Sequence, residues 1–262
     1  ASLALEYGQS AVAASNTSKF TTSGASISLP ASTTNLTTKQ GSDGTVKNYT
    51  VITSLGAEGS TTATDLQGMQ GGLSTNYAMG ADIDAAATSG WTNTWNPVGN
   101  DIVKFTGRLD GLGNTISNLT IIPASDKSGL FKEVSYATIQ NLNLDTVSIT
   151  GSRAFIGALA GQVNNSTLSN ITAKDVVVTG HSRLGALVGH VLSTNVANVS
   201  VTGNSSVTGS SSSVGGVFGD SGATLVNVTS TAAVTAGSMT GGLIGNYSGG
   251  GVSDSWASGA VS

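Results

Sequence analysis

A block of two glycines around three mostly apolar residues recurs through the second half of the chain. Its copies are GALAGQV (157–163), GALVGHV (185–191), GGVFGDS (215–221) and GGLIGNY (241–247), and their first glycines are 28, 30 and 26 residues apart. A less regular copy, SGLFKEV, precedes them at 128–134. Self-similarity at a fixed period of this length is typical of solenoids and other repeat architectures.

Two further features follow the same period. An Asn followed by alternating apolar residues starts NLNL at 141, NITA at 170, NVSV at 198 and NVTS at 227, and Asp254 takes its place in DSWA. A third feature closes each unit at the glycines of SITG, VVTG, SVTG and AVTAG. The shared period, about 28 residues, therefore indicates units of three short β segments separated by Gly, Ser, Asn or Thr turns.

One such unit is too thin to bury its apolar face alone, whereas stacked neighbours bury it against each other. The expected fold is therefore all-β: a parallel β-helix with about 28 residues per coil in the C-terminal half and a rise of about 4.8 Å per coil. A right-handed sense is expected because crossovers between parallel strands are almost always right-handed. One short helix is expected in the N-terminal half.

The period assigns structural roles to the repeated residues. Equivalent apolar residues are expected to stack in the core: Leu159, Leu187, Val217 and Leu243. The glycines fit tight corners or close approach of two backbones. Side-chain amides are expected to form a ladder along the axis, made of Asn141, Asn170, Asn198 and Asn227. Asn118 is expected to take the ladder position in the coil over 105–121, and Asp254 to interrupt the ladder at the last rung.

The N-terminal half repeats less clearly. We divide the chain into an irregular β region over 1–104, which caps the solenoid or is inserted into it, and repeats over 105–262. Strands are expected within 2–8, 25–30 and 48–55. The helix is expected over 62–73, where Thr64 and Gln67 have the spacing of a capping box.

Composition excludes several classes of partner and chemistry. Only 9% of residues are charged and the net charge is −4, so the chain lacks the basic face that nucleic acid would need. There are no cysteines, which excludes disulfides, thiolate metal ligands and cysteine nucleophiles. The chain is rich in Gly, Ser and Thr, but its periodic Val, Ile and Leu favour a thin β structure over disorder.

Repeats of the form GALVG…N-I/V-x-V…V-T-G resemble the GLUG repeats of bacterial surface proteins similar to filamentous haemagglutinin. The stretch TDLQGMQGGLSTNYAMGADIDA…WNPVG…FTGRLDGLGNTISNLTI resembles the segment that precedes such repeats, and KNYTVITSLGAEGS fits the same setting. The resemblance covers residues 45–262. It implies a secreted or surface-attached β-helical fibre, exported through an outer-membrane transporter by two-partner secretion. The implied partner is a receptor on host cells, matrix or other bacteria, or a glycan.

Catalytic and metal sites are not indicated by the residue pattern, and no cofactor is expected. Asp82 and Asp84 are close together, at i and i+2 on one strand face. They could form a cation site or an acid–base pair, but we predict that they are strand-edge or turn residues. His181 and His190 have no neighbouring carboxylate cluster and make a poor metal site. Trp91 and Trp95 share one loop and are the candidate ligand-binding residues, because aromatic rings can stack on sugars; plugging of the N-terminal core is the alternative role.

Three functions are compatible with the sequence. The first is a non-catalytic segment of a secreted or cell-surface adhesin that mediates attachment to host cells, matrix or other bacteria. The second is a lyase or hydrolase acting on polysaccharides, which would need clustered carboxylates on one face. The third is an ice-binding solenoid, which ranks lowest because the threonines shift register between coils. The first function is the one we predict.

Overall fold

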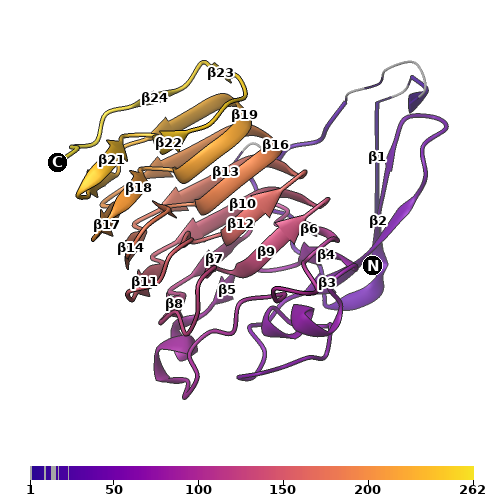
Figure 1. Ribbon diagram of the computed structural model, residues 1–262. Coiled ribbons are helices and arrows are strands. Elements are labelled where there is room, and N and C mark those ends of the chain that lie inside the picture. The colour runs from indigo at the N-terminus through magenta and orange to yellow at the C-terminus, as the bar shows by residue number, and fades with distance from the viewer. Residues whose placement is uncertain (1, 9, 13–15, 17, 23) are drawn as a thin grey trace.

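Equivalent strands of successive coils pair in parallel and build a β-solenoid of about nine turns, with equivalent residues about 29 positions apart. The structure is a computed structural model that describes residues 2–8, 10–12, 16, 18–22 and 24–262. Thr138 pairs with Thr167, and Thr167 pairs with Asn195. The predicted all-β parallel solenoid is thus confirmed, and Figure 1 shows its coils stacked from magenta to yellow.

Three sheets form the walls of the solenoid. The largest contains β3 (Lys47–Ile52), β4 (Asn76–Met79), β5 (Ile83–Asp84), β6 (Arg108–Asp110), β7 (Thr115–Ser117), β9 (Phe131–Ser135), β10 (Thr138–Asp145), β12 (Ala160–Asn164), β13 (Thr167–Lys174), β16 (Val188–Thr202), β19 (Phe218–Ser230), β22 (Ile244–Tyr247), β23 (Val252–Ser253) and β24 (Trp256–Ala257). The second contains β8 (Thr120–Ile121), β11 (Ser148–Thr150), β14 (Val177–Gly180), β17 (Ser206–Gly209) and β20 (Ala233–Thr235). The third contains β15 (Leu184–Gly185), β18 (Ser212–Gly215) and β21 (Ser238–Gly241).

Parallel stacking already begins upstream of residue 105. Strand β3 pairs in parallel with β4, and β4 pairs with β6. The division into 1–104 and 105–262 stays a prediction about where the repeat sequence becomes regular.

The core column predicted from the glycine blocks is present. Leu159, Leu187 and Val217 are fully buried, and Leu243 is half-buried at the C-terminal end. The backbone N–H of Leu159 donates to the carbonyl of Leu187, and that of Leu187 donates to Val217. Burial of each such side chain contributes about 1.5–3 kcal/mol, so the repeated apolar column is a main source of stability.

The glycines of the repeated block serve close packing of backbones. A Cβ added at Gly161 would lie 2.4 Å from the Cα of Lys127, and one added at Gly157 would lie 2.5 Å from the carbonyl oxygen of Leu187. Neither glycine has a positive φ. Left-handed corners are instead formed by non-glycine residues two positions before the first glycine of each block: Lys127, Phe155, Arg183, Ser213 and Met239.

The amide ladder is confirmed over four rungs. Asn170 Nδ2 donates to Asn141 Oδ1 (3.0 Å), and Asn198 and Asn227 continue the column at 3.0 and 2.9 Å. All four residues are left-handed, a conformation that Asn tolerates well. Asp254 is also left-handed and makes no hydrogen bond to Asn227 among the described residues, so the ladder ends there as predicted.

The expectation for Asn118 is wrong. Asp110 lies below Asn141 and accepts its Nδ2 at 3.0 Å, whereas Asn118 Nδ2 donates to Asp84 at another corner. The reason is spacing: Asn118 lies 23 positions before Asn141, whereas successive ladder residues are 28 or 29 positions apart. Asn118 follows Ser117, which pairs with Asp145, so it lies in the strand region beyond the ladder corner.

The predicted helix over 62–73 is reduced to the 3-10 helix η2 (Gln67–Gly71), and a second one, η3 (Ala86–Gly90), was not predicted. The predicted capping box is absent: no side chain caps η2 at its N-cap position, Leu66. Asp65 instead accepts the backbone N–H of Gly68 (2.6 Å). Two glycines within η2 keep it short. Within the described residues, no helix has the length and hydropathy needed to cross a membrane.

An arm formed by β1 (Leu3–Tyr7) and β2 (Ser32–Gln40) stands away from the solenoid (Figure 1). Strand β2 pairs antiparallel with β3, which joins the arm to the first coil. A small second core of Leu36, Tyr49, Val51, Ala78 and Leu112 lies at its base. The predicted strand over 25–30 is not formed, although Ile27 and Leu29 each donate a backbone hydrogen bond to the solenoid.

Candidate functional site

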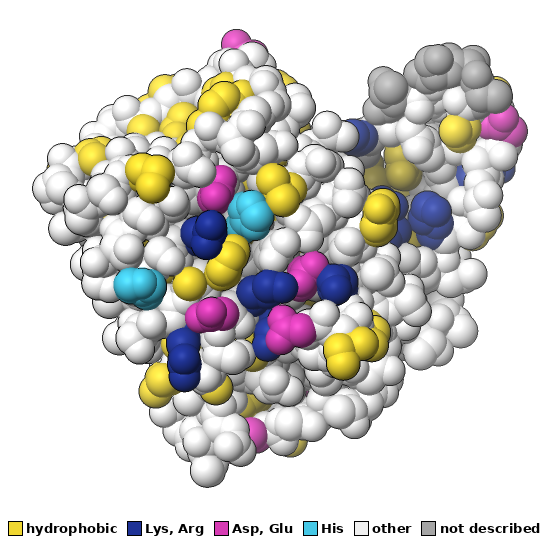
Figure 2. Space-filling view, in the orientation of Figure 1, with side chains coloured by type: hydrophobic (Ala, Val, Ile, Leu, Met, Phe, Trp, Pro, Cys, Tyr) yellow, Lys and Arg dark blue, Asp and Glu magenta, His cyan; other side chains and the backbone are white. Residues whose placement is uncertain are grey.

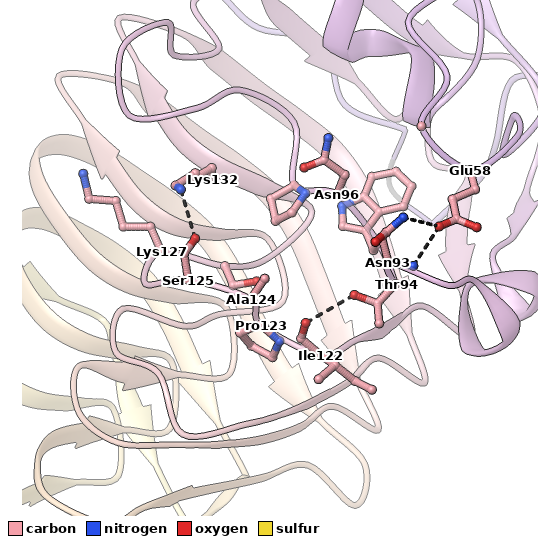
Figure 3. A pocket seen from close by; sticks show the side chains of 14 residues that line it. Glu58, Asn93, Thr94, Asn96, Ile122, Pro123, Ala124, Ser125, Lys127 and Lys132 are labelled. Atoms are coloured by element: carbon pink, nitrogen blue, oxygen red, sulfur yellow. Dashed lines mark hydrogen bonds between the residues drawn. The ribbon is translucent and has the colours of Figure 1, made fainter.

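A cavity of about 370 Å³ lies between two loops of successive coils. One loop spans residues 91–98 and the other spans 122–128, and Lys132 of β9 lines the same space. Figure 3 shows Lys127 and Lys132 at one end of the cavity and Glu58 at the other. Its size is within the range of small-molecule sites.

Trp95 forms part of the wall and anchors the first loop. Its side chain is 1% exposed, and its Nε1 donates to the carbonyl of Leu130 at 3.1 Å. Trp91 stacks on it with ring centroids 6.1 Å apart and is half-buried, but it does not line the cavity. The structure therefore brings the two candidate residues together, and Trp95, which lines the cavity, is almost completely buried.

Glu58 fixes the entrance of the first loop. Its carboxylate accepts the backbone N–H groups of Asn93 (2.7 Å) and Thr92 (3.1 Å), and also the Asn93 side-chain amide (3.1 Å). The bond from the Asn93 backbone is the main reason why the pKa of Glu58 lies below its usual value. Glu58 is therefore ionised at neutral pH and acts as a clamp on the loop.

Two buried or bridging contacts complete the scaffold. Gln67, which is fully buried, donates to the carbonyl of Asn96 (3.0 Å) and accepts its N–H (3.3 Å). Thr94 Oγ1 donates to the carbonyl of Ile122 (3.2 Å), which joins the two loops directly. The cavity is therefore preformed, because both of its walls are tied to buried or paired groups.

The lysines belong to a charged cluster on the outer face of β9. Lys127 Nζ lies 2.8 Å from Glu133, and Lys132 Nζ lies 3.0 Å from Asp101 and 3.1 Å from the hydroxyl of Ser125. Lys104 contacts the same nearly buried Glu133 at 3.8 Å. Figure 2 shows Lys, Arg, Asp and Glu side chains gathered on one face of the solenoid. The lysines are held in place and still line the cavity.

The chemistry of the lining suits a polar ligand with some apolar surface. Amides and hydroxyls come from Asn93, Asn96 and Ser125, and proline rings come from Pro97 and Pro123. Glu58 is the only carboxylate among the lining residues, whereas most glycosidases use two. In the described part of the chain, no three His, Asp or Glu residues are close enough to hold a metal ion. The lining offers hydrogen-bonding groups, apolar surface and one carboxylate to a polar ligand.

The other residues considered in the sequence lie elsewhere. Asp82 accepts the N–H of Thr115 (2.8 Å), and Asp84 accepts Asn118 Nδ2 (2.9 Å) and the N–H of Ala86 (3.0 Å). Both act as corner residues. His181 is exposed beside Ser210 (3.1 Å), and His190 is half-buried next to Phe155.

Comparison with known proteins gives partial matches. Residues 61–180 match the family described as the M26 IgA1-specific metallo-endopeptidase N-terminal region. The chain is similar to bacterial immunoglobulin A1 proteases. It is 36% identical over 123 residues to that of Streptococcus sanguinis (44% of this chain, 6% of that one) and 28% identical over 151 residues to one of Streptococcus pneumoniae (56% and 7%).

Two further comparisons also give partial matches. Halomucin of Haloquadratum walsbyi is 38% identical over 122 residues, which is 44% of this chain and 1% of halomucin. A crystal structure of a candidate immunoglobulin A1 protease from Bacteroides ovatus aligns over 82% of this chain and 77% of that one, at 16% identity and a TM-score of 0.44. The chain spans at most 7% of the length of these curated relatives. The expected resemblance to filamentous haemagglutinin stays a prediction, because the matched family model describes a different group.

Sequence reasoning missed most of the lining residues. Lys127, Lys132 and Asn93 are brought together only by the stacking of coils, which no local pattern displays. One signal was available: the chain has three prolines, and two of them, Pro97 and Pro123, line the cavity. Proline cannot donate a backbone hydrogen bond to a neighbouring strand, so in a chain of β repeats it indicates a loop outside the sheets.

Proposed function

We propose that this chain is a non-catalytic, glycan-binding segment of a secreted or surface-attached bacterial adhesin. The observation that carries the proposal is the preformed cavity, whose walls are tied by Gln67 and Glu58 and lined by amides, hydroxyls, lysines and proline rings. Saccharides are bound by such combinations of hydrogen-bonding groups and apolar surface. The receptor is a glycan on a host cell, on matrix or on another bacterium.

A glycan and matrix-protein array on the whole chain tests this proposal, with a variant that fills the cavity. Ala124 lines the cavity and is exposed, so Ala124→Trp should block ligand entry without disturbing the core. Ala233→Trp, at an exposed position on β20, is the matched control. Binding that is lost in the first variant and kept in the second supports the proposal. Equal binding by both variants places the ligand outside the cavity.

The alternative of a polysaccharide lyase or hydrolase is tested on the same material. Incubation with uronic-acid polymers and neutral glycans, followed by product detection, should show no turnover. Any turnover that depends on Glu58, the single lining carboxylate, would favour the enzyme over the adhesin.

The family comparison supports a second proposal. The match over residues 61–180 is to the N-terminal region of IgA1-specific metallo-endopeptidases, and it includes both cavity loops. On this proposal the solenoid engages immunoglobulin A1 for a protease domain of a longer protein. Surface plasmon resonance with immobilised immunoglobulin A1 tests this second proposal. Binding that Ala124→Trp blocks would favour this partner, whereas absence of binding would contradict it and leave the glycan proposal.

Export belongs to the first proposal. Passage through an outer-membrane transporter is supported by the resemblance of the repeats to two-partner-secretion fibres and by the absence of cysteines. Co-expression of the full-length protein with such a transporter, followed by fractionation, should place it outside the cell.

A further inference from the structure

A groove separates the N-terminal arm from the outer face of the solenoid, independently of the loop cavity. Two hollows of about 260 and 310 Å³ meet there, and both are lined by Tyr7, Gln40 and Arg108. None of their lining residues lines the loop cavity. Figure 2 shows Lys and Arg side chains at the base of the arm, beside this hollow.

Positive charge in the groove is not neutralised by ion pairs. Arg108 lines both hollows, Lys19 lines one and Lys47 lines the other, and none of the three forms a salt bridge with a described residue. Asp43 is the only carboxylate among the lining residues, and it accepts the N–H of Val12. A local excess of cations therefore exists in a chain whose net charge is −4.

Asp110 lies two residues along the same strand and its charge interacts with that of Arg108, but the two side chains form no salt bridge. Its oxygens are occupied by Gln140 Nε2 (2.7 Å), Asn141 Nδ2 (3.0 Å) and the N–H of Leu112 (3.0 Å). The Asp110 side chain is 1% exposed, so its carboxylate is not accessible to a ligand in the groove. The guanidinium of Arg108 is the half-buried, unpaired cation at the centre of the site.

Aromatic and polar groups surround this cation. Tyr7 and Phe20 meet edge to face with ring centroids 5.4 Å apart, and both line the groove. Gln40 Nε2 donates to the carbonyls of Asn16 (2.8 Å) and Ser18 (2.9 Å), which fixes the arm loop. Thr138 and Thr167 line the floor of the groove. Thr138 pairs with Thr167 on one neighbouring strand and with Arg108 on the other.

We infer that this groove binds an acidic polysaccharide, with Arg108 contacting its carboxylate or sulfate groups. Arginine donates two parallel hydrogen bonds to such planar or tetrahedral anions, and charge-assisted bonds are roughly twice as strong as neutral ones. Aromatic rings supply a surface for the sugar ring. The threonine column lies along the solenoid axis, so an extended chain can follow it from one coil to the next.

Titration of the whole chain with heparin fragments, hyaluronan fragments and neutral dextran tests this site. Heparin carries sulfates and carboxylates, whereas hyaluronan carries carboxylates only. Comparing the two polymers therefore shows which anionic group is recognised. Binding of either acidic polymer, weakened by added salt and not shared by dextran, is expected. Binding of heparin alone identifies sulfate as the recognised group; binding of both identifies the carboxylate.

Arg108→Gln should weaken that binding by about tenfold or more. Arg153→Gln is the matched control, because the variant has the same net charge as Arg108→Gln. Arg153 is exposed, forms no salt bridge with any residue that the structure describes and lies outside both hollows. Lys47→Gln, at an exposed position, provides a second test if Arg108→Gln fails to fold. Equal weakening by Arg108→Gln and Arg153→Gln would overturn the inference. Equally tight, Arg108-dependent binding of duplex DNA would overturn the saccharide class.

Discussion

Asn170 donates a hydrogen bond from Nδ2 to Oδ1 of Asn141, the residue 29 positions earlier, at 3.0 Å. The same bond recurs between successive coils, and at the N-terminal end of the column Asn141 Nδ2 donates a hydrogen bond to Asp110. One column of amides therefore ties the corners of neighbouring coils along the axis. The ladder is buried at Asn141 and exposed at Asn227. Substitutions at these two positions therefore compare the contributions of buried and exposed ladder bonds to stability.

Asn141→Ala should lower the free energy of unfolding by about 2–4 kcal/mol, because it leaves buried partners unpaired and places Ala in a left-handed conformation. Asn227→Ala has the same backbone penalty and loses one exposed bond, so about 1–2 kcal/mol is expected. Urea unfolding of both variants measures the difference. Equal losses would show that the buried ladder bonds add nothing beyond the backbone conformation.

Gly161→Ala should destabilise the solenoid by about 1–3 kcal/mol, because the new Cβ would meet the backbone of Lys127 at 2.4 Å. Gly237→Ala is the control, since its Cβ would have no neighbour nearer than 3.7 Å. Thermal unfolding followed by circular dichroism compares them. A shift for Gly237→Ala as large as that for Gly161→Ala would argue against close backbone approach as the reason for the repeated glycine.

Asp110 should make stability depend on pH. Burial raises the pKa of Asp110 above its ordinary value of 3.8. The hydrogen bonds from Asn141 and Gln140 lower this pKa but do not outweigh the effect of burial. A carboxyl with a raised pKa stabilises the fold below its unfolded pKa, and this contribution is lost as pH rises through the folded pKa. Asp110→Asn removes the ionisation.

The stability of wild type relative to Asp110→Asn should therefore fall as pH increases from about 3.8 upward. Urea unfolding at a series of pH values from acid to neutral measures this difference. Parallel profiles for the two proteins would contradict a raised pKa at Asp110.

Trp95→Ala should cost about 3–5 kcal/mol of stability, as expected for a fully buried aromatic residue, and it also leaves the carbonyl of Leu130 without the indole donor. Trp91→Ala should cost less than about 2 kcal/mol because Trp91 is only half-buried. Chemical unfolding separates the two. If Trp91→Ala is stable and keeps ligand binding, Trp91 is removed from the candidate site.

The repeat predicted the solenoid, the apolar column and four rungs of the ladder, because each depends on residues that recur at one spacing. Asn118 was assigned wrongly because its local sequence, SNLTI, resembles SNITA at Asn170, although it lies only 23 positions before Asn141, which is less than one coil. Strand β2 and the groove beside Arg108 were not predicted. They result from packing of the arm onto the first coils, which leaves no period in the sequence.

The cavity between the loops was not predicted. Trp91 and Trp95 lie in one of its two loops, and the Trp95 indole is held by the carbonyl of Leu130, 35 residues further along the chain. The lysines and Ser125 come from the next coil. Their distances depend on how consecutive coils stack, so the chemistry of the lining emerges only in three dimensions.

Direct binding of an array-selected glycan to wild type, Ala124→Trp and Ala233→Trp, measured by isothermal titration calorimetry, tests the proposed function most directly. We expect saturable binding by wild type and Ala233→Trp, loss of at least about tenfold in affinity for Ala124→Trp, and no conversion of the recovered glycan. Unchanged affinity in Ala124→Trp, or a glycan recovered in cleaved form, would contradict a non-catalytic binding segment whose ligand occupies this cavity.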